Sequence, residues 1–268
     1  MLLREVEYAR PASVQEALRL LGSHEGARAL AGGQTLINVM KARAASPDVL
    51  VDLADIGELR GIELGSDGTL TIGAMTTYTD IVESAEARAR PILGEVCTQI
   101  ADVQVRNRGT IGGNVCSNDP TNHLPPLLVA VGAAMTILGQ EGERSVPARE
   151  FFLGVYMTAA GPGELLTKIS VPPGKGDGFA SVPIGRDGTC IVNVAASLDS
   201  GAPTLAIGCV DAVPVVLTPD SAAEETVRVA VRGANLDPPS DVHASADYRR
   251  HLAEVLALRA VAQAAGRT

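Results

Sequence analysis

The segment that most constrains the fold is Ala31-Gly32-Gly33-Gln34-Thr35, which lies between an apolar run at 27–31 and a helix-like segment at 36–43. A strand, a glycine turn and a helix start, in that order, are typical of an anion-binding loop. Paired glycines adopt backbone conformations closed to other residues and let a phosphate approach the main chain. The N–H groups that open the helix then face the anion. Because most glycine pairs are plain turns, this loop alone predicts no ligand.

A second glycine loop of the same kind, Thr110-Ile111-Gly112-Gly113-Asn114, raises the first above a plain turn. If both loops line one groove, they suit a ligand with two phosphates, and a dinucleotide is the natural choice. The fingerprint G-x-G-x-x-G is missing from both loops, which disfavours a Rossmann site.

The size and composition predict a mixed α and β protein of two compact units, or of one domain with a subdomain. The chain has 268 residues, 46% of them hydrophobic, and its 28 glycines and 16 prolines favour many tight turns over long helical bundles. A net charge of -9 without a basic stripe argues against nucleic-acid binding. The most apolar window, 124–138, falls short of the ~20 residues that cross a bilayer, and the charged amino terminus does not resemble a signal peptide. The interpretation is a soluble cytoplasmic protein.

The four cysteines, Cys97, Cys116, Cys190 and Cys209, are widely spaced and include no C-x-x-C. No local motif therefore exists for a zinc site or an iron–sulfur cluster, and no metal ligand is assigned. Their predicted role is that of small buried apolar residues.

Hydrophobic periodicity predicts strands at 5–9, 27–31 and 49–53 that alternate with helices after Ser13 and Thr35. A glycine hairpin near 62–72, helices at 79–89, 91–100 and 124–131 and a strand at 134–138 follow, with a polar, turn-rich stretch at 115–123. The segment 164–171 completes this first region. Pro172 to Gly176 is the best linker. Beyond it we expect strands at 190–197 and 204–210 and helices at 222–232 and 246–265. The last helix is predicted to carry Tyr248, Leu252, Val255, Leu256 and Arg259 on one side.

Polar residues after the second loop, Asn114, Ser117, Asp119 and Asn122, suit the hydroxyl groups of a ribityl chain or a ribose. The competing interpretation is that Asp119 only caps the apolar helix that follows. Arg106 and Arg108 can screen phosphate charge, although surface arginines are usually only solvated. His123 lacks partners for a metal site.

Two stretches carry a family resemblance: L-A-G-G-Q-T-L-I-N-V-M-K-A-R at 30–43 and R-N-R-G-T-I-G-G-N-V-C-S-N-D-P at 106–120. Together they resemble the FAD-binding medium subunit of the molybdenum hydroxylases, the group that includes the carbon monoxide dehydrogenase flavoprotein and the FAD domain of xanthine dehydrogenase. The last helix, with its Y-R-R-H-L start at 248–252, resembles the carboxy-terminal domain of that family. The resemblance thus spans nearly the whole chain.

The resemblance implies an α+β fold of the vanillyl-alcohol-oxidase type. It places an FAD-binding domain at 1–173, with subdomains at about 1–55 and 56–173, before a small α+β domain at 177–268. Both loops would hold the FAD pyrophosphate, Ser117 and Asp119 would lie near the sugar hydroxyls, and Leu165 or Leu166 would pack on the isoalloxazine ring. The implied cofactor-binding residues are Leu30, Ala31, Gly32, Gly33, Gln34, Thr35, Leu36, Thr110, Ile111, Gly112, Gly113, Asn114, Ser117, Asp119, Leu165 and Leu166.

The resemblance also implies how such a subunit works. The flavin is the redox group, so no catalytic side chain is needed on this chain. Molybdopterin and two [2Fe-2S] clusters are expected on a large and a small partner subunit, which agrees with the missing cysteine motifs. FAD passes electrons to an acceptor such as NAD, oxygen or quinone.

The sequence departs from the family at three positions. His123 stands where many relatives have an acidic residue, and a gapless alignment of 179–196 puts Ser181 at the usual lysine and Gly188 at the usual aspartate. These departures concern the flavin-ring side of the site more than the phosphate loops.

Two other functions remain open from the sequence. A stand-alone flavin oxidase would need a general base near the ring, and the sequence identifies none. A non-catalytic flavin- or nucleotide-binding module is favoured if the departures near the ring abolish redox activity.

Overall fold

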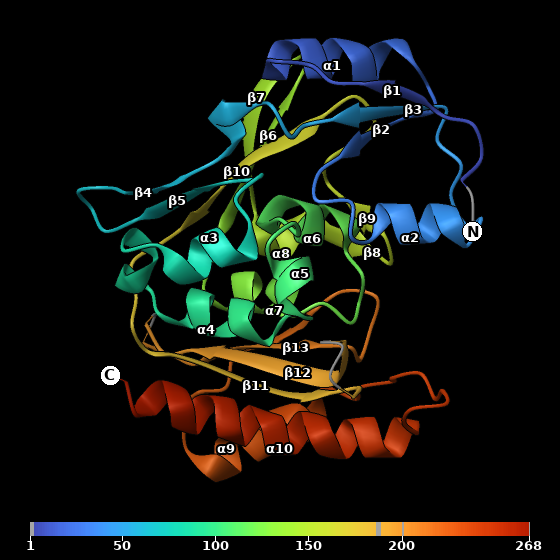
Figure 1. Cartoon of the computed structure of the whole chain (residues 1–268). Helices are drawn as coiled ribbons and strands as arrows, with labels where there is room; N and C mark the ends of the chain where they lie inside the picture. The colour runs from blue at the N-terminus through green and yellow to red at the C-terminus, as the bar shows by residue number, and fades with distance from the viewer. Residues whose placement is uncertain (1–2, 186–188, 200, 268) are drawn as a thin grey trace.

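The computed structural model describes residues 3–185, 189–199 and 201–267, and it has an α+β fold, which confirms the expected class. In Figure 1 a small parallel sheet lies at the top, a helical layer fills the middle, and a third sheet lies below with the last two helices beneath it. Within the described residues, no helix is long and apolar enough to cross a membrane.

The amino-terminal part is a three-stranded parallel sheet with the strand order β1-β3-β2. Val49 and Val51 of its central strand are buried, and they pack against Val14 and Ala17 of the first helix. Ser13 caps that helix as expected, because its side chain accepts a hydrogen bond from Glu16 N at 3.2 Å. The elements are β1 (Glu7–Ala9), α1 (Val14–Ser23), β2 (Ala27–Leu30), α2 (Leu36–Lys41) and β3 (Val49–Asp52).

The central part is built on a five-stranded antiparallel sheet with the order β4-β5-β10-β6-β7. Its middle strand, β10, pairs with both β5 and β6, and a long helical insertion separates those two strands in the sequence. The insertion carries much of the largest apolar core. The strands and 3-10 helices are η1 (Gly57–Leu59), β4 (Ile62–Leu64), β5 (Leu70–Gly73), η2 (Glu86–Ala89), β6 (Ala134–Gly139), β7 (Gly142–Pro147), β8 (Phe152–Gly154), β9 (Met157–Thr158) and β10 (Leu165–Val171). The helices are α3 (Tyr78–Glu83), α4 (Ile92–Gln99), α5 (Val103–Arg106), α6 (Ile111–Ser117), α7 (Leu124–Ala130) and α8 (Ala148–Phe151).

The stretch at 115–123, predicted to be turn-rich, begins instead as the last turn of α6. That helix extends to Ser117 and ends at Asn118, which takes the left-handed conformation with φ 38°. Asn118 is held there because its side chain donates hydrogen bonds to the carbonyl oxygens of Gly154, at 2.6 Å, and Met157, at 3.2 Å.

The carboxy-terminal part is a four-stranded antiparallel sheet, β11-β12-β13-β14, whose elements are β11 (Asp177–Pro183), β12 (Cys190–Ser197), β13 (Thr204–Gly208), β14 (Val215–Leu217), α9 (Glu224–Gly233) and α10 (Ala246–Ala265). Figure 1 shows α10 below β11 and β12, and α7 of the central part above them. The buried face of α10 includes Arg249, Leu252 and Leu256. The predicted face is wrong at its edges, because Tyr248 and Arg259 are exposed.

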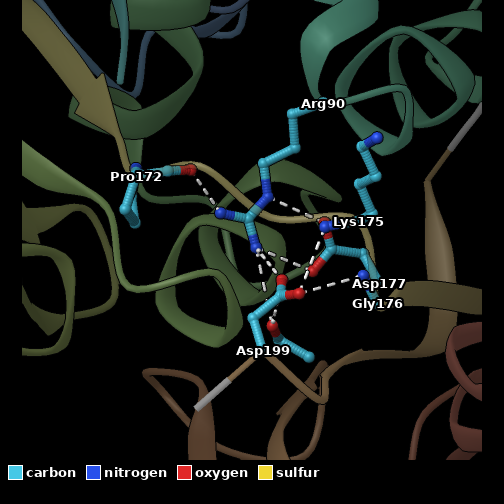
Figure 2. Close-up of polar contacts among 7 residues, drawn as sticks. Arg90, Pro172, Lys175, Gly176, Asp177 and Asp199 are labelled. Atoms are coloured by element: carbon cyan, nitrogen blue, oxygen red, sulfur yellow. Dashed lines mark hydrogen bonds and ion pairs between the residues drawn. The ribbon is translucent and has the colours of Figure 1, made fainter. Parts of the chain in front are cut away.

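A buried ion pair joins the central part to the carboxy-terminal sheet (Figure 2). The Arg90 guanidinium donates to both carboxylate oxygens of Asp177, at 2.7 and 2.8 Å, and the two side chains are each only 2% exposed. Arg90 also donates to Pro172 O at 2.5 Å and to Asp199 at 3.0 Å. One side chain thus fixes the connection at 172–177 and the end of β12.

A groove between two glycine loops

The first glycine loop forms one wall of a groove of about 290 Å³, at the lower end of the ~300–1,000 Å³ typical of small-molecule sites. The loop connects β2 to α2, so the strand ends and the helix begins at the groove. The lining residues are Leu30, Ala31, Gly32, Gly33, Gln34, Ile37, Asn38, Lys41, Asp52 and Arg108.

The backbone of this loop offers unused hydrogen-bond donors. The N–H groups of Gly32, Gly33, Gln34 and Thr35 have no acceptor within the described residues. Gly33 has φ +74°, a conformation that residues with a Cβ rarely adopt, and it turns the chain between strand and helix. Because α2 has only six residues, the four N–H groups matter more here than the helix dipole. An anion is the ligand that such a set of donors fits.

Thr35 stands at the N-cap of α2, as predicted, but its side chain makes no capping bond. Its own backbone is already helical, with φ -95° and ψ -55°, whereas a capping residue usually has an extended backbone. The exposed hydroxyl therefore remains available to a ligand.

The second glycine loop lies against the first but uses its donors internally. The N–H groups of Ile111 and Gly112 donate to the carbonyl oxygens of Thr76 and Ala74, at 3.0 and 2.9 Å. Those of Gly113 and Asn114 donate to Thr110 Oγ1 and Thr110 O, each at 3.0 Å. This loop therefore offers a ligand few main-chain donors.

The second loop instead sets the shape of the groove. A Cβ added to Gly32 would meet Arg108 O at 2.0 Å and Gly109 Cα at 2.8 Å, and one added to Gly113 would meet Ala31 Cβ at 3.4 Å. The glycines are needed because the two backbones pass this close. The structure thus brings the two sequence motifs together, although they act differently.

Positive charge in the groove comes from Arg108 and Lys41. Neither side chain forms an ion pair with a described residue, so both are free to meet an anion. Arg106, the other arginine considered from the sequence, has a structural role: it donates to the carbonyl oxygens of Ile100 and Ala101, at 3.1 and 2.7 Å. Asp52 is the acidic residue in the groove, and Tyr8 OH donates to its carboxylate.

Hydrogen bonds join the polar residues that follow the second loop. Asn122 Nδ2 donates to Asn114 O at 3.1 Å and to Ser117 Oγ at 3.3 Å. Asp119 accepts from Thr121 N at 2.9 Å and from Tyr156 OH at 3.0 Å. The Asn114 side-chain oxygen is buried and has no partner among the described residues. Ser117 and Asp119 do not line the groove itself.

The leucines proposed for the flavin ring both belong to the protein core. Leu165 and Leu166 are 4% and 5% exposed, and they point into different clusters on either side of β10. Neither lines the groove.

The three departures from the family pattern have different surroundings. Ser181 Oγ donates to Gln99 Oε1 at 3.3 Å. His123 is 2% exposed and stacks on Phe179 with ring centroids 5.7 Å apart, so its side chain faces the carboxy-terminal sheet. Gly188 lies outside the described residues.

Sequence reasoning missed four groove residues: Ile37, Asn38, Lys41 and Asp52. Ile37, Asn38 and Lys41 lie at positions i, i+1 and i+4 of α2 and so share one side of the helix. The helical period of the segment was therefore a signal that could have identified them. Asp52 ends the strand beside β2, and only the parallel pairing of Leu30 with Asp52 brings it to the loop.

Comparison with known proteins places the chain among well-defined relatives. A family described as "FAD binding domain in molybdopterin dehydrogenase" matches residues 4–174. The carbon monoxide dehydrogenase medium chain of Afipia carboxidovorans is 40% identical, over 100% of this chain and 99% of that protein. The glyceraldehyde dehydrogenase medium chain of Sulfolobus acidocaldarius is 33% identical, over 97% of this chain and 99% of that protein. A solved structure of reconstituted CO dehydrogenase from Oligotropha carboxidovorans superposes with a TM-score of 0.92 at 36% identity and covers 100% of both chains.

Proposed function

Because the chain belongs to the family of FAD-binding domains of molybdopterin dehydrogenases, we propose that the groove beside Gly32 and Gly33 holds the pyrophosphate of FAD. The chain is the medium, FAD-binding subunit of a molybdenum-containing dehydrogenase, since it matches such medium chains over its full length. Bound FAD supplies the redox chemistry. This chain binds the cofactor and holds it where electrons can enter and leave.

The observation that carries the proposal is the set of four N–H groups at 32–35 that find no acceptor in the described part of the chain. A pyrophosphate carries two negative phosphates, and charge-assisted hydrogen bonds contribute about 1.5–3 kcal/mol each. Arg108 and Lys41, which also line the groove, add positive charge. The residues present therefore fit the cofactor that the family implies.

We assign the remaining roles by position. Leu30, Ala31, Gln34, Thr35 and Leu36 form the first loop around the phosphates. Thr110, Ile111, Gly112, Gly113 and Asn114 form the supporting second loop, and Ser117 and Asp119 face the sugar hydroxyls. One of Leu165 and Leu166, which lie on opposite sides of β10, would pack on the isoalloxazine ring. Residues 1–173 make up the cofactor domain and 177–268 a separate carboxy-terminal domain.

The complex that we propose contains two further subunits. A small subunit would carry the iron–sulfur clusters and a large subunit the molybdopterin, and the electron acceptor would be NAD, oxygen or quinone. We place the complex in the cytoplasm. The named relatives are medium chains of a carbon monoxide dehydrogenase and of a glyceraldehyde dehydrogenase, and in the proposed complex the substrate pocket would lie on the molybdopterin subunit.

Binding of two flavins tests the site. The purified chain is titrated with FAD and, separately, with riboflavin, which has the same ring but no phosphate. We expect tight binding of FAD and binding of riboflavin that is weaker by at least a hundredfold. Equal affinities would refute the pyrophosphate site, and no binding of either flavin would refute the function.

Co-expression with the neighbouring reading frames tests the assembly. We expect the chain to co-purify with an iron–sulfur polypeptide and a molybdopterin polypeptide. A flavin-loaded chain that associates with neither would instead support the stand-alone oxidase.

A further inference from the structure

The groove beside the first glycine loop contains a carboxylate, Asp52, in a place that otherwise suits phosphates. The backbone N–H groups at 32–35 and the side chains of Lys41 and Arg108 all favour an anion there. Asp52 is the acidic residue among those that line the groove, and its charge repels a phosphate. A hydrogen-bond donor on the ligand, next to the phosphates, would offset this repulsion.

Parallel strand pairing brings Asp52 to the loop. Asp52 is the last residue of β3, and its partner in the register is Leu30, the last residue of β2. Because the two strands run in the same direction, their carboxyl ends lie at one edge of the sheet, and the first glycine loop begins at that edge. In open α/β sheets, ligands bind outside the carboxyl ends of the strands. The topology therefore gives Asp52 the position of a ligand-binding residue.

Two neighbours orient the Asp52 carboxylate without neutralising it. Its Oδ1 accepts from Ala54 N at 2.9 Å, and its Oδ2 accepts from the hydroxyl of Tyr8 on β1. The hydrogen bond to Asp52 raises the pKa of Tyr8, so this hydroxyl keeps its proton and remains a donor. Within the described part of the chain, Asp52 forms no ion pair. A carboxylate has about four acceptor sites, so about two remain for a ligand.

FAD has a sugar on each side of its pyrophosphate, and the surroundings assign the two sugars to different places. Ser117 and Asp119, proposed above for sugar hydroxyls, follow the second glycine loop and do not line the groove, so they suit the ribityl chain of the flavin. The groove is lined instead by residues such as the apolar Ile37, whose Cγ1 would lie 3.4 Å from a Cβ added to Gly33. An apolar wall and a carboxylate together suit the adenosine half.

Dinucleotide-binding proteins use the same chemistry on a different fold. There an acidic residue about 20 positions after the glycine loop accepts a hydrogen bond from a ribose hydroxyl. Asp52 follows Gly32 at a similar interval, although the Rossmann fingerprint is missing. The likeness therefore lies in the pairing of a carboxylate with a sugar hydroxyl, and not in the fold.

We propose that Asp52 accepts hydrogen bonds from the ribose hydroxyls of the adenosine half of FAD, and that it makes the groove select an ADP-bearing flavin over FMN. The inference deepens the proposed function and rests on it. Tyr8 is a positioning residue, because its hydroxyl contacts the carboxylate while its side chain does not line the groove. A hydrogen bond to a charged acceptor is among the stronger ones, so its loss should weaken binding of adenosine-containing ligands about tenfold or more.

Nucleotide binding to the flavin-free chain tests the ligand without any variant. Isothermal titration calorimetry compares ADP with 2′-deoxy-ADP and 3′-deoxy-ADP. We expect ADP to bind and to compete with FAD, and at least one deoxy analogue to bind about tenfold more weakly than ADP. Failure of ADP to displace FAD, or equal affinities for ADP and both deoxy analogues, would overturn the proposal.

The variant Asp52→Ala should change the affinities for two probes in opposite directions. ADP should bind about tenfold more weakly or worse, because the acceptor is lost, and the deoxy analogues should no longer differ from ADP. Inorganic pyrophosphate should bind at least as tightly as it does to the wild type, because a repelling charge has left the groove. An equal loss of affinity for ADP and for pyrophosphate would mean that the substitution only distorts the loop, and the ribose role would be refuted.

Asp55→Ala is the matched control, since it removes the same charge from the segment that follows β3. The Asp55 carboxylate pairs with Arg10, is 51% exposed and does not line the groove, so this variant should leave the affinities for ADP and pyrophosphate unchanged. Tyr8→Phe should weaken ADP less than Asp52→Ala does and leave pyrophosphate binding unchanged. A loss of ADP affinity in Asp55→Ala as large as that in Asp52→Ala would overturn the assignment to Asp52.

FMN separates the two sugars of the cofactor. It has the flavin ring, the ribityl chain and one phosphate but no adenosine, so Asp52→Ala should not weaken its binding. A loss of FMN affinity equal to the loss of ADP affinity would place Asp52 at the ribityl chain and overturn the proposal. Failure of the wild-type chain to bind FAD would refute the proposed function itself, whereas tight FAD binding that Asp52→Ala leaves unchanged would refute only the role of Asp52.

Discussion

Removing the Arg90 guanidinium leaves an isolated carboxylate in the protein interior, and the structure predicts how much this costs. In Arg90→Met the methionine fills the apolar path of the side chain, but Asp177, 1% exposed, loses the partner of both its carboxylate oxygens. An unpaired buried charge of this kind costs about 3–5 kcal/mol. At roughly 2–4 °C per kcal/mol for a chain of this size class, the melting temperature should fall by about 6–20 °C.

A double variant separates the buried charge from lost packing. Arg90→Met with Asp177→Asn removes both charges, so it should cost no more than Arg90→Met alone. Asp199 needs no replacement, because its carboxylate is 30% exposed and accepts from the backbone N–H groups of Lys175 and Gly176.

Urea unfolding followed by far-UV circular dichroism measures these differences, since the chain has no Trp for fluorescence. A cost below about 1 kcal/mol for Arg90→Met, or a double variant whose cost equals the sum of the single variants, would refute the reasoning.

Three shorter predictions concern the loops and the acid range. Gly33→Ala should lower FAD affinity at least tenfold. The control variant Gly142→Ala, at a glycine with φ +111° and nothing within 4 Å of the added Cβ, should cost similar stability and leave FAD affinity unchanged. Equal effects of the two variants in an FAD titration would contradict the assignment of the first glycine loop to the phosphates. Arg108→Gln should weaken FAD about fivefold, or about 1 kcal/mol, and flatten the salt dependence of binding, while Arg88→Gln on the exposed surface should do neither. The pKa of Asp199 is lowered because backbone N–H groups and Arg90 outweigh its desolvation. Its contribution to stability is therefore present above about pH 4 and is lost as pH falls through the folded pKa. Asp199→Asn should cost less stability at pH 3 than at pH 7, and urea unfolding at both pH values measures the difference.

Local patterns predicted most of the elements. The strands 49–52 and 27–30 and the helix after Ser13 follow from apolar periodicity and a cap. The parallel pairing of the two strands is made by the tertiary fold and was not predicted. The face of α10 was less predictable. Arg249 is buried there because its guanidinium donates to Ile191 O and to Asp241. Ile191 is distant in sequence, and Asp241 lies in the segment before α10, so helical periodicity alone does not indicate either partner.

The sequence predicted two glycine loops that both bind phosphate through their main chain. In the structure only the first loop leaves its N–H donors without acceptors among the described residues. The paired glycines did identify both places. What the sequence could not show is that Ile111 and Gly112 donate to Thr76 and Ala74, because that pairing is made by the tertiary fold.

Amide hydrogen exchange of the first glycine loop tests the central claim most directly. The N–H groups of Gly32 to Thr35 have no acceptor among the described residues, whereas those at 111–114 are already bonded. Exchange at 32–35 should be fast in the flavin-free chain and slow sharply when FAD, but not riboflavin, is bound, while 111–114 should be protected in both states. Unchanged exchange at 32–35 in the FAD-saturated chain would contradict the account.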